Sequence, residues 1–439
     1  MSNAEHTPLT LAQGLLLASA GILLLPSPWL ETNWHWFLLE VIGLLLGIML
    51  LVVHRREALP IPGIVVAFIA YVSVTFALYL IPVPPDVWLA LPGRDFYQDV
   101  ATLLAQTGNP MGWHSLSVDP YATAQTLLSI LPALVLFLAT ISLDTDRLYV
   151  LVRLLITVAA LQATWGLIQY SGAGGSAHGS YYNRDHYSTL MEFTLPLVIA
   201  LTAHHMAHRR EHDEGRHKTL LAFYLAAATL IFLGGMFAMS RAGIPNLFLA
   251  IVLTPLLLSR KVRKTHAALF IVLFLALVMT LAYLTGLVPV INRFIAADPL
   301  ADARWVMFTQ QIEAIQQFFP LGSGPGTFGN VYTAFQPMEQ VGAGFVAHAH
   351  NDYLELLLET GAIGISLLVF FLGIFLYGWY RLWQHARHPL FMLQVGAGMG
   401  LLLSLIHAFF DFNFHTIPHP LIFACLAGIF LKTLTTHKK

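Results

Sequence analysis

Long apolar stretches alternate along the chain with short polar connections. Each stretch is close to the roughly 20 residues that carry an α-helix across the hydrocarbon core of a bilayer. We therefore predict an all-α integral membrane protein with about twelve spanning helices, whose boundaries are good to a few residues. The predicted spans cover 10–26, 34–53, 61–81, 122–142, 148–170, 187–207, 219–238, 242–258, 266–289, 352–380, 391–410 and 417–434.

Two connections, at 82–121 and 290–351, are long enough to hold structure of their own, so we expect one polytopic domain, 1–439, with two substantial loops. The second loop, between predicted helices 9 and 10, repeats apolar residues at helical spacing. It predicts an amphipathic helix over 303–319 that lies on the outer leaflet or caps the helix bundle, ended by Pro320. Its apolar side would carry Trp305, Phe308, Ile312, Ile315 and Phe319.

A glycine-rich turn, 321–328, follows this helix. Backbone N–H groups around Gly324 and Gly326 could cradle a phosphate. The alternative is a tight turn that simply needs positive φ angles. The turn lacks the lysine and the strand–helix context of a nucleotide-binding loop, so we predict no nucleotide site.

Composition supports a membrane protein: 57% of the 439 residues are hydrophobic and 10% are charged, against roughly 25% charged in soluble domains. The net charge of −1 provides no basic face for nucleic acid. Cys425 is the only cysteine, which excludes an internal disulfide and a cysteine-based metal cluster. No Lys or Arg precedes the first apolar run, which we expect to be a retained helix and not a signal peptide.

The distribution of basic residues predicts the orientation. With the N-terminus in the cytoplasm and alternating spans, 17 of the 22 Lys and Arg residues, including every lysine, fall on the cytoplasmic side. Both termini are then cytoplasmic, and the loops at 82–121 and 290–351 lie outside.

Five arginines are exceptions to this bias. They could form ion pairs with nearby acids such as Asp185, or they could hold an anionic substrate, because arginine grips phosphate oxygens bidentately. The five are Arg94, Arg184, Arg241, Arg293 and Arg304.

The segment 348–355 leads into the tenth predicted helix. Asn351 is a good N-cap, and Asp352 favours the first turn. His350 therefore stands at a helix N-terminus on the external surface, where a neutral imidazole suits a base and where anions bind. The alternative is a histidine that only forms hydrogen bonds within a polar loop.

Several motifs then occur in order. His350-Asn351, nine residues, Gly361, two residues and Gly364 fit the His-Asn-x9-Gly-x-x-Gly pattern of the O-antigen ligase and polymerase superfamily. Three other segments resemble the Asn-Arg-x-His, Ser-Arg and long-loop patterns of this family. In the same order, these segments are 180–187, 240–243, and Arg304 followed by 320–328. The resemblance as a whole covers about residues 115–365.

The resemblance implies a GT-C type membrane glycosyltransferase in the bacterial inner membrane, with its active site on the periplasmic face. Members transfer glycans from undecaprenyl diphosphate. The acceptor is lipid A–core oligosaccharide in the ligases of lipopolysaccharide biosynthesis, or a second lipid-linked glycan in the O-antigen and exopolysaccharide polymerases. A third branch glycosylates proteins. No cofactor, nucleic acid or essential metal is implied.

Within that reaction, we expect His350 to be the general base of an inverting transfer and Arg184, Arg241 and Arg304 to stabilise the diphosphate. No set of residues has metal-ligand spacing, since His348 and His350 lie only two positions apart. The remaining candidates for substrate binding are polar or glycine residues beside these four: Asn183, His186, His348, Asn351, Asp352, Gly324 and Gly326.

A second polar cluster lies at the outer ends of the last two predicted helices, and it predicts either a functional site or an interfacial structural network. Its members are His407, Asp411, Asn413, His415 and His419. A transporter is the rival class, because Arg153 and Glu192 lie within apolar runs. The chain shows no internal repeat, so the transporter is the weaker interpretation.

Overall fold

The computed structural model describes residues 33–53, 59, 61–173, 175–208, 214–259, 303–338 and 346–435, together with the isolated positions 272, 274, 276, 280 and 283. Within this part of the chain nearly all regular structure is helical. The exception is one antiparallel pairing of β1 (Pro82–Val83) with β2 (His114–Ser115).

Five helices are long and apolar enough to cross a membrane: α6 (Pro120–Ser142), α7 (Thr145–Ala173), α8 (Arg184–Ala207), α9 (Glu214–Phe237) and α15 (Asp352–Gln384). Five more are apolar: α2 (Asn33–Val53), α3 (Gly63–Tyr79), α10 (Gly243–Leu258), α16 (Phe391–His407) and α17 (His419–Phe430). These ten helices coincide with ten of the predicted runs, which confirms the helical membrane class. The run at 10–26 and, apart from isolated positions, the run at 266–289 lie outside the described residues.

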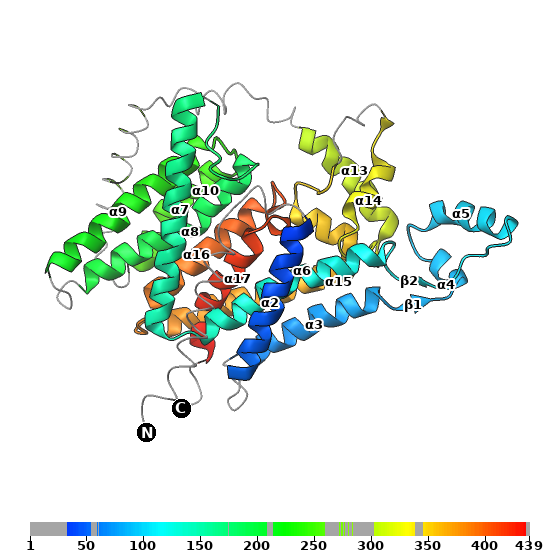
Figure 1. Ribbon diagram of the computed structural model, residues 1–439, viewed down its shortest axis with the longest axis horizontal. Coiled ribbons are helices and arrows are strands. Elements are labelled where there is room, and N and C mark those ends of the chain that lie inside the picture. The colour runs from blue at the N-terminus through cyan, green and yellow to red at the C-terminus, as the bar shows by residue number, and fades with distance from the viewer. Residues whose placement is uncertain are drawn as a thin grey trace.

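Helix α8 forms the centre of the bundle, with α7, α9, α10 and α16 packed around it (Figure 1). Every residue from 186 to 202 is buried. A helix that is enclosed on all sides is expected to be largely apolar. Most residues in this range are apolar, and its buried polar residues are His186, Ser188, Thr189, Glu192, Thr194 and Thr202. The packing of the neighbouring helices around α8 therefore fixes the position of its first turn.

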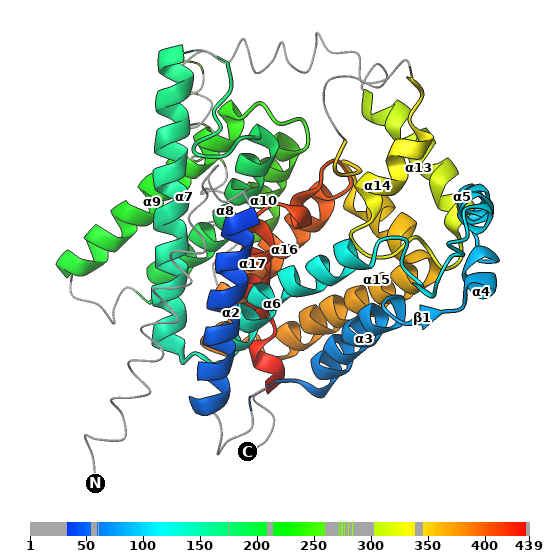
Figure 2. The same cartoon turned by 45° about the vertical axis from the view of Figure 1, so that its right-hand side comes forward.

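A smaller cluster of helices lies at one end of the molecule, near the start of α15 (Figure 2). It contains α13 (Ala303–Phe318), α14 (Phe328–Tyr332) and η4 (Thr333–Phe335). The predicted helix over 303–319 is thus present. Of the predicted apolar side, Ile315 is buried in the protein, whereas Trp305, Ile312 and Phe319 are about half exposed. Ala314 and Phe318 complete the face that packs on α14 and α15.

The loop at 82–121 carries α4 (Pro85–Leu89) and α5 (Asp95–Gln106), which lie at the far end of α3 (Figure 1). Arg94 is buried here, with its guanidinium over the rings of Trp88 and Phe318. It donates a 2.8 Å hydrogen bond to the carbonyl of Leu116. Of the two interpretations for the outside arginines, a structural role therefore describes Arg94.

Helix α15 is interrupted at Gly361, whose φ of 53° and ψ of −132° are not helical. A side chain there would collide with the carbonyl of Pro320. That carbonyl accepts a 2.8 Å hydrogen bond from the amide of Ala362. The glycine of the His-Asn-x9-Gly motif thus lets the turn after α13 pack against α15, and this contact holds the first turns of α15 in place.

Candidate functional site

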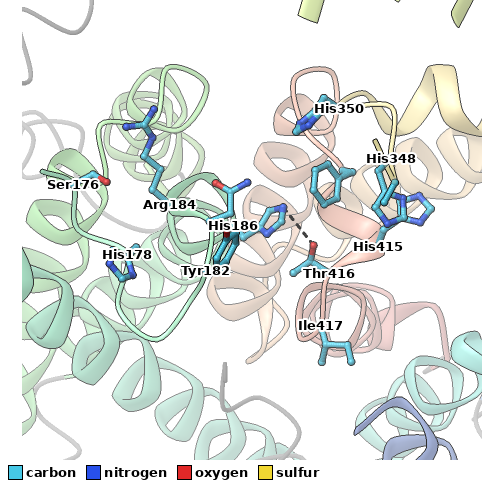
Figure 3. Close-up of a pocket in the computed structure, with 13 residues that line it drawn as sticks. Ser176, His178, Tyr182, Arg184, His186, His348, His350, His415, Thr416 and Ile417 are labelled. Carbon is cyan, nitrogen blue, oxygen red and sulfur yellow. Dashed lines mark hydrogen bonds between the residues drawn. The ribbon is translucent and has the colours of Figure 1, made fainter. Parts of the chain in front are cut away.

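A cavity of about 820 Å³ lies between three segments that are distant in sequence. One side comes from the loop before α8 and its first turn. The other comes from the residues before α15 and from the connection between α16 and α17, as Figure 3 shows. Its lining is rich in histidine: His178, His186, His348, His350 and His415.

His350 stands at the rim of this cavity, directly before the N-cap of α15, with φ at 51°. Its ring Nδ1 lies 3.1 Å from Oδ1 of Asp411, and its side chain is 30% exposed while that of Asp411 is fully buried. The other carboxylate oxygen of Asp411 lies 3.5 Å from Nε2 of His186. Asp411 therefore lies between two histidines that line the cavity.

Asp411 is ionised in this setting. Burial alone would raise the pKa of its carboxyl, but the hydrogen bond from His350 and the charges of His186, His407 and Arg304 hold that pKa well below its ordinary value. An ionised carboxylate only accepts, so Nδ1 of His350 donates. The basic lone pair of His350 is then on Nε2.

Two of the predicted arginines lie near this pair. Arg184 is the first residue of α8 and lines the cavity beside His186 (Figure 3). Arg304 belongs to the first turn of α13, and its Nη2 lies 3.2 Å from Oδ2 of Asp185. Arg304 therefore forms the ion pair that was one of the two predicted roles for these arginines. The pair places its guanidinium beside the start of α8.

Arg241 occupies the turn between α9 and α10 and is not among the residues that line the cavity. Two positions later, Gly243 packs so closely against Ser188 and Glu192 that a side chain would collide with both. The turn is thus held against α8 about one helical turn beyond Arg184. Arg293 lies outside the described residues.

Asn183 and Asn351 act as N-caps. The side-chain oxygen of Asn183 accepts a 2.8 Å hydrogen bond from the amide of Asp185, and Asn183 also lines the cavity. The side chain of Asn351 is buried and accepts from the amides of Tyr353 and Leu354, at 3.0 and 3.1 Å. Asn351 does not line the cavity.

The glycine-rich turn does not face the cavity. Gly324 packs against Ser117 and Gly326 against Thr126, both near the start of α6. The amide of Gly324 donates to the carbonyl of Glu359 at 2.8 Å. With φ angles of 116° and 79°, these two glycines fit the alternative of a tight turn that needs positive φ.

A second group of ionisable side chains lies beside the first. Nδ1 of His348 is 2.8 Å from Oε1 of Glu355, and Nε2 of His415 is 3.4 Å from the same oxygen. Asp352 is buried next to them, 3.5 Å from His415. Burial lowers the pKa of His415 to about 4, so its imidazole is neutral near pH 7.

The polar cluster at the outer ends of the last two helices is therefore divided between several contacts. Asp411 pairs with His350, and His415 with Glu355. Deeper in the bundle, His407 lies 2.8 Å from Glu192, and Thr189 donates a 2.9 Å hydrogen bond to Asn413. The sequence drew attention to these residues as a group but offered no signal for their partners, which lie 60 or more positions away.

The bundle of apolar helices defines an integral membrane protein with a histidine- and arginine-lined site at one end. Residues 226–369 match a family model described as O-antigen ligase. The match begins within α9 and ends within α15, so it contains Arg241, Arg304, His350 and both motif glycines. This match confirms the predicted resemblance of the chain to the O-antigen ligase and polymerase superfamily. No curated protein matches the sequence.

Proposed function

We propose that the chain is an O-antigen ligase-like glycosyltransferase of the bacterial inner membrane, with both termini cytoplasmic. It would transfer a glycan from undecaprenyl diphosphate to a lipid A–core acceptor on the periplasmic face. The family match supports a function of the O-antigen ligase and polymerase type. The observation that carries the finer proposal is the pairing of His350 with buried Asp411 at the rim of a cavity that Arg184 also lines.

In this reaction, Nε2 of His350 removes the proton from the acceptor hydroxyl as the oxygen attacks the anomeric carbon of the donor sugar. The bond from that carbon to the diphosphate breaks, and undecaprenyl diphosphate leaves with the bonding electron pair. Direct displacement inverts the anomeric configuration. Asp411 holds the ring orientation and stabilises the imidazolium that forms, as acids do in other histidine–carboxylate pairs.

Arg184 and Arg304 would bind the diphosphate and stabilise the charge that develops on it. Arg241 would join them from the neighbouring turn. Because permanently charged guanidinium groups supply this stabilisation, the proposed transfer step needs no cofactor and no divalent metal. Asn183, His186 and His348, which line the cavity, would bind the substrate there.

A polymerase would use the same chemistry with a second lipid-linked glycan as acceptor, so purified chain should be assayed with both acceptors. A transporter receives less support. Glu192, one of the two residues that motivated it, is buried and paired with His407, and it accepts a 2.7 Å hydrogen bond from Asn246.

The decisive variant is His350→Ala. We expect transfer from undecaprenyl diphosphate-linked glycan to fall by about 10²–10⁴-fold, because a positioned general base contributes that much. His385→Ala, at the C-terminal end of α15, is the matched control and should transfer normally. Near-normal turnover in a folded His350→Ala protein would remove the proposed base.

A further inference from the structure

The tertiary structure assembles two imidazoles and two carboxylates from three segments: His348 before α15, Asp352 and Glu355 in its first turns, and His415 in η6 (Asn413–His415). One ligand atom from each of His348, Glu355 and His415 lies within 4.8 Å of the other two. The sequence alone does not indicate this site, because His415 lies 60 positions from Glu355.

We propose that His348, Glu355 and His415 bind one divalent transition-metal ion, for which Zn²⁺ is the best fit, while the carboxylate of Asp352 lies beside His415 and adds negative charge next to the site. Imidazole and carboxylate are ligands that zinc accepts in tetrahedral sites. Bonds of about 2.0–2.2 Å in a tetrahedron separate neighbouring ligand atoms by roughly 3.3 Å. The observed separations are 2.8 Å for His348–Glu355 and 3.4 Å for His415–Glu355.

The hydrogen bonds of the two carboxylates point to the same site. Oε2 of Glu355 accepts a 2.7 Å hydrogen bond from the amide of Ala349, which orients Oε1 toward the two imidazoles. Such outer contacts commonly orient metal ligands. Oδ1 of Asp352 is buried and has no hydrogen-bond partner among the described residues. A buried carboxylate oxygen that makes no hydrogen bond is costly, and a cation held beside it by His415, 3.5 Å away, would offset that cost.

An ion could reach the cluster from the main cavity, because His348 and His415 both line it. Once bound, it would join the segment before α15 to α15 itself and to η6. His350 lies two residues beyond His348, so the ion would hold the backbone that carries His350. Its role is structural, and the proposal does not rest on the transferase reaction.

The test counts metal in the purified full-length chain. After equilibration with Zn²⁺ and removal of free ions, we expect one zinc per wild-type chain by elemental analysis. Glu355→Gln and His415→Ala should each weaken zinc binding by more than about 100-fold, because even outer contacts cost 10–100-fold. His178→Ala is the matched control, since it removes another cavity-lining histidine and should retain the zinc.

Two measurements on the wild-type chain guard against variants that fail to fold. Zn²⁺ should raise its thermal unfolding temperature, and Co²⁺ should give the visible absorption bands of tetrahedral nitrogen and oxygen coordination. A wild-type chain that retains no zinc and shows no Co²⁺ bands, or folded variants that bind zinc as well as wild type, would overturn the proposal. Because turnover is not measured, either result leaves the proposed function standing.

Discussion

Nδ1 of His350 lies 3.1 Å from Oδ1 of Asp411, although the two residues are separated by 61 positions and by helices α15 and α16. The acid is fully buried and the histidine is partly exposed to the cavity. This contact gives His350 a defined tautomer, with the proton on Nδ1 and the basic nitrogen on Nε2. It also gives Asp411, just after the end of α16, a partner, whereas burial of an unpaired carboxylate would be costly.

Asp411→Asn should lower turnover by about 10²–10⁴-fold with little change in KM. Asparagine cannot stabilise an imidazolium, and it can favour the wrong histidine tautomer. Transfer kinetics with purified protein would measure the effect. Asp99→Asn, at an exposed position of α5, is the matched control and should be silent. A higher KM with an unchanged kcat would show that Asp411 does not act through His350.

Arg184→Lys and Arg304→Lys should each reduce transfer about tenfold or more, because an ammonium cannot reproduce the bidentate fork of a guanidinium on a diphosphate. Arg381→Lys provides the control, since it lies in the last turn of α15, about 45 Å of helix from His350. Activity on the diphosphate-linked donor is the measurement.

The ion pair of Arg304 with Asp185 needs its own variant, because a purely structural pair would also respond to Arg304→Lys. Asp185→Asn removes the ion pair and keeps the guanidinium of Arg304. We expect it to retain much more activity than Arg304→Lys. Equal losses in the two variants would assign Arg304 to the fold and not to the diphosphate.

Gly361→Ala should destabilise the protein by at least about 1–3 kcal/mol, because alanine is strained at this φ and ψ and would collide with the carbonyl of Pro320. Gly373→Ala is a control in the same helix, with no atom within 4 Å of the added carbon. Its stability should be unchanged or higher by up to about 1 kcal/mol. Thermal unfolding in detergent compares the two variants, and equal unfolding temperatures would contradict the proposed role of the kink.

The predicted orientation can be tested with single cysteines. The side chain of Met338 is 82% exposed in the loop before His350, and that of Glu214 is 72% exposed at the start of α9. In intact cells, a membrane-impermeant maleimide should label Met338→Cys and spare Glu214→Cys. The wild-type chain supplies the blank, because its single cysteine, Cys425, is buried. The reverse labelling pattern would place the site in the cytoplasm and contradict the proposed function.

Local signals in the sequence were sufficient for much of the architecture. Apolar runs of bilayer length predicted ten helices that the structure contains, because a helix satisfies its own backbone hydrogen bonds within one segment. The N-cap at Asn351 and the helix that begins at 303 could also be predicted, because capping and hydrophobic periodicity act over a few neighbouring residues. His350 and the outside arginines were singled out by type and position alone.

Only the tertiary structure decided which of these groups meet. It paired His350 with Asp411, placed His415 beside Glu355, buried Arg94 under Phe318, and turned the glycine-rich segment toward α6 and α15. Each of these contacts joins segments at least 35 residues apart in the sequence. Which residues become partners depends on how whole helices pack, through close contacts such as that of Gly361 with Pro320. Side-chain periodicity along one helix does not indicate which residues a distant helix will place against it.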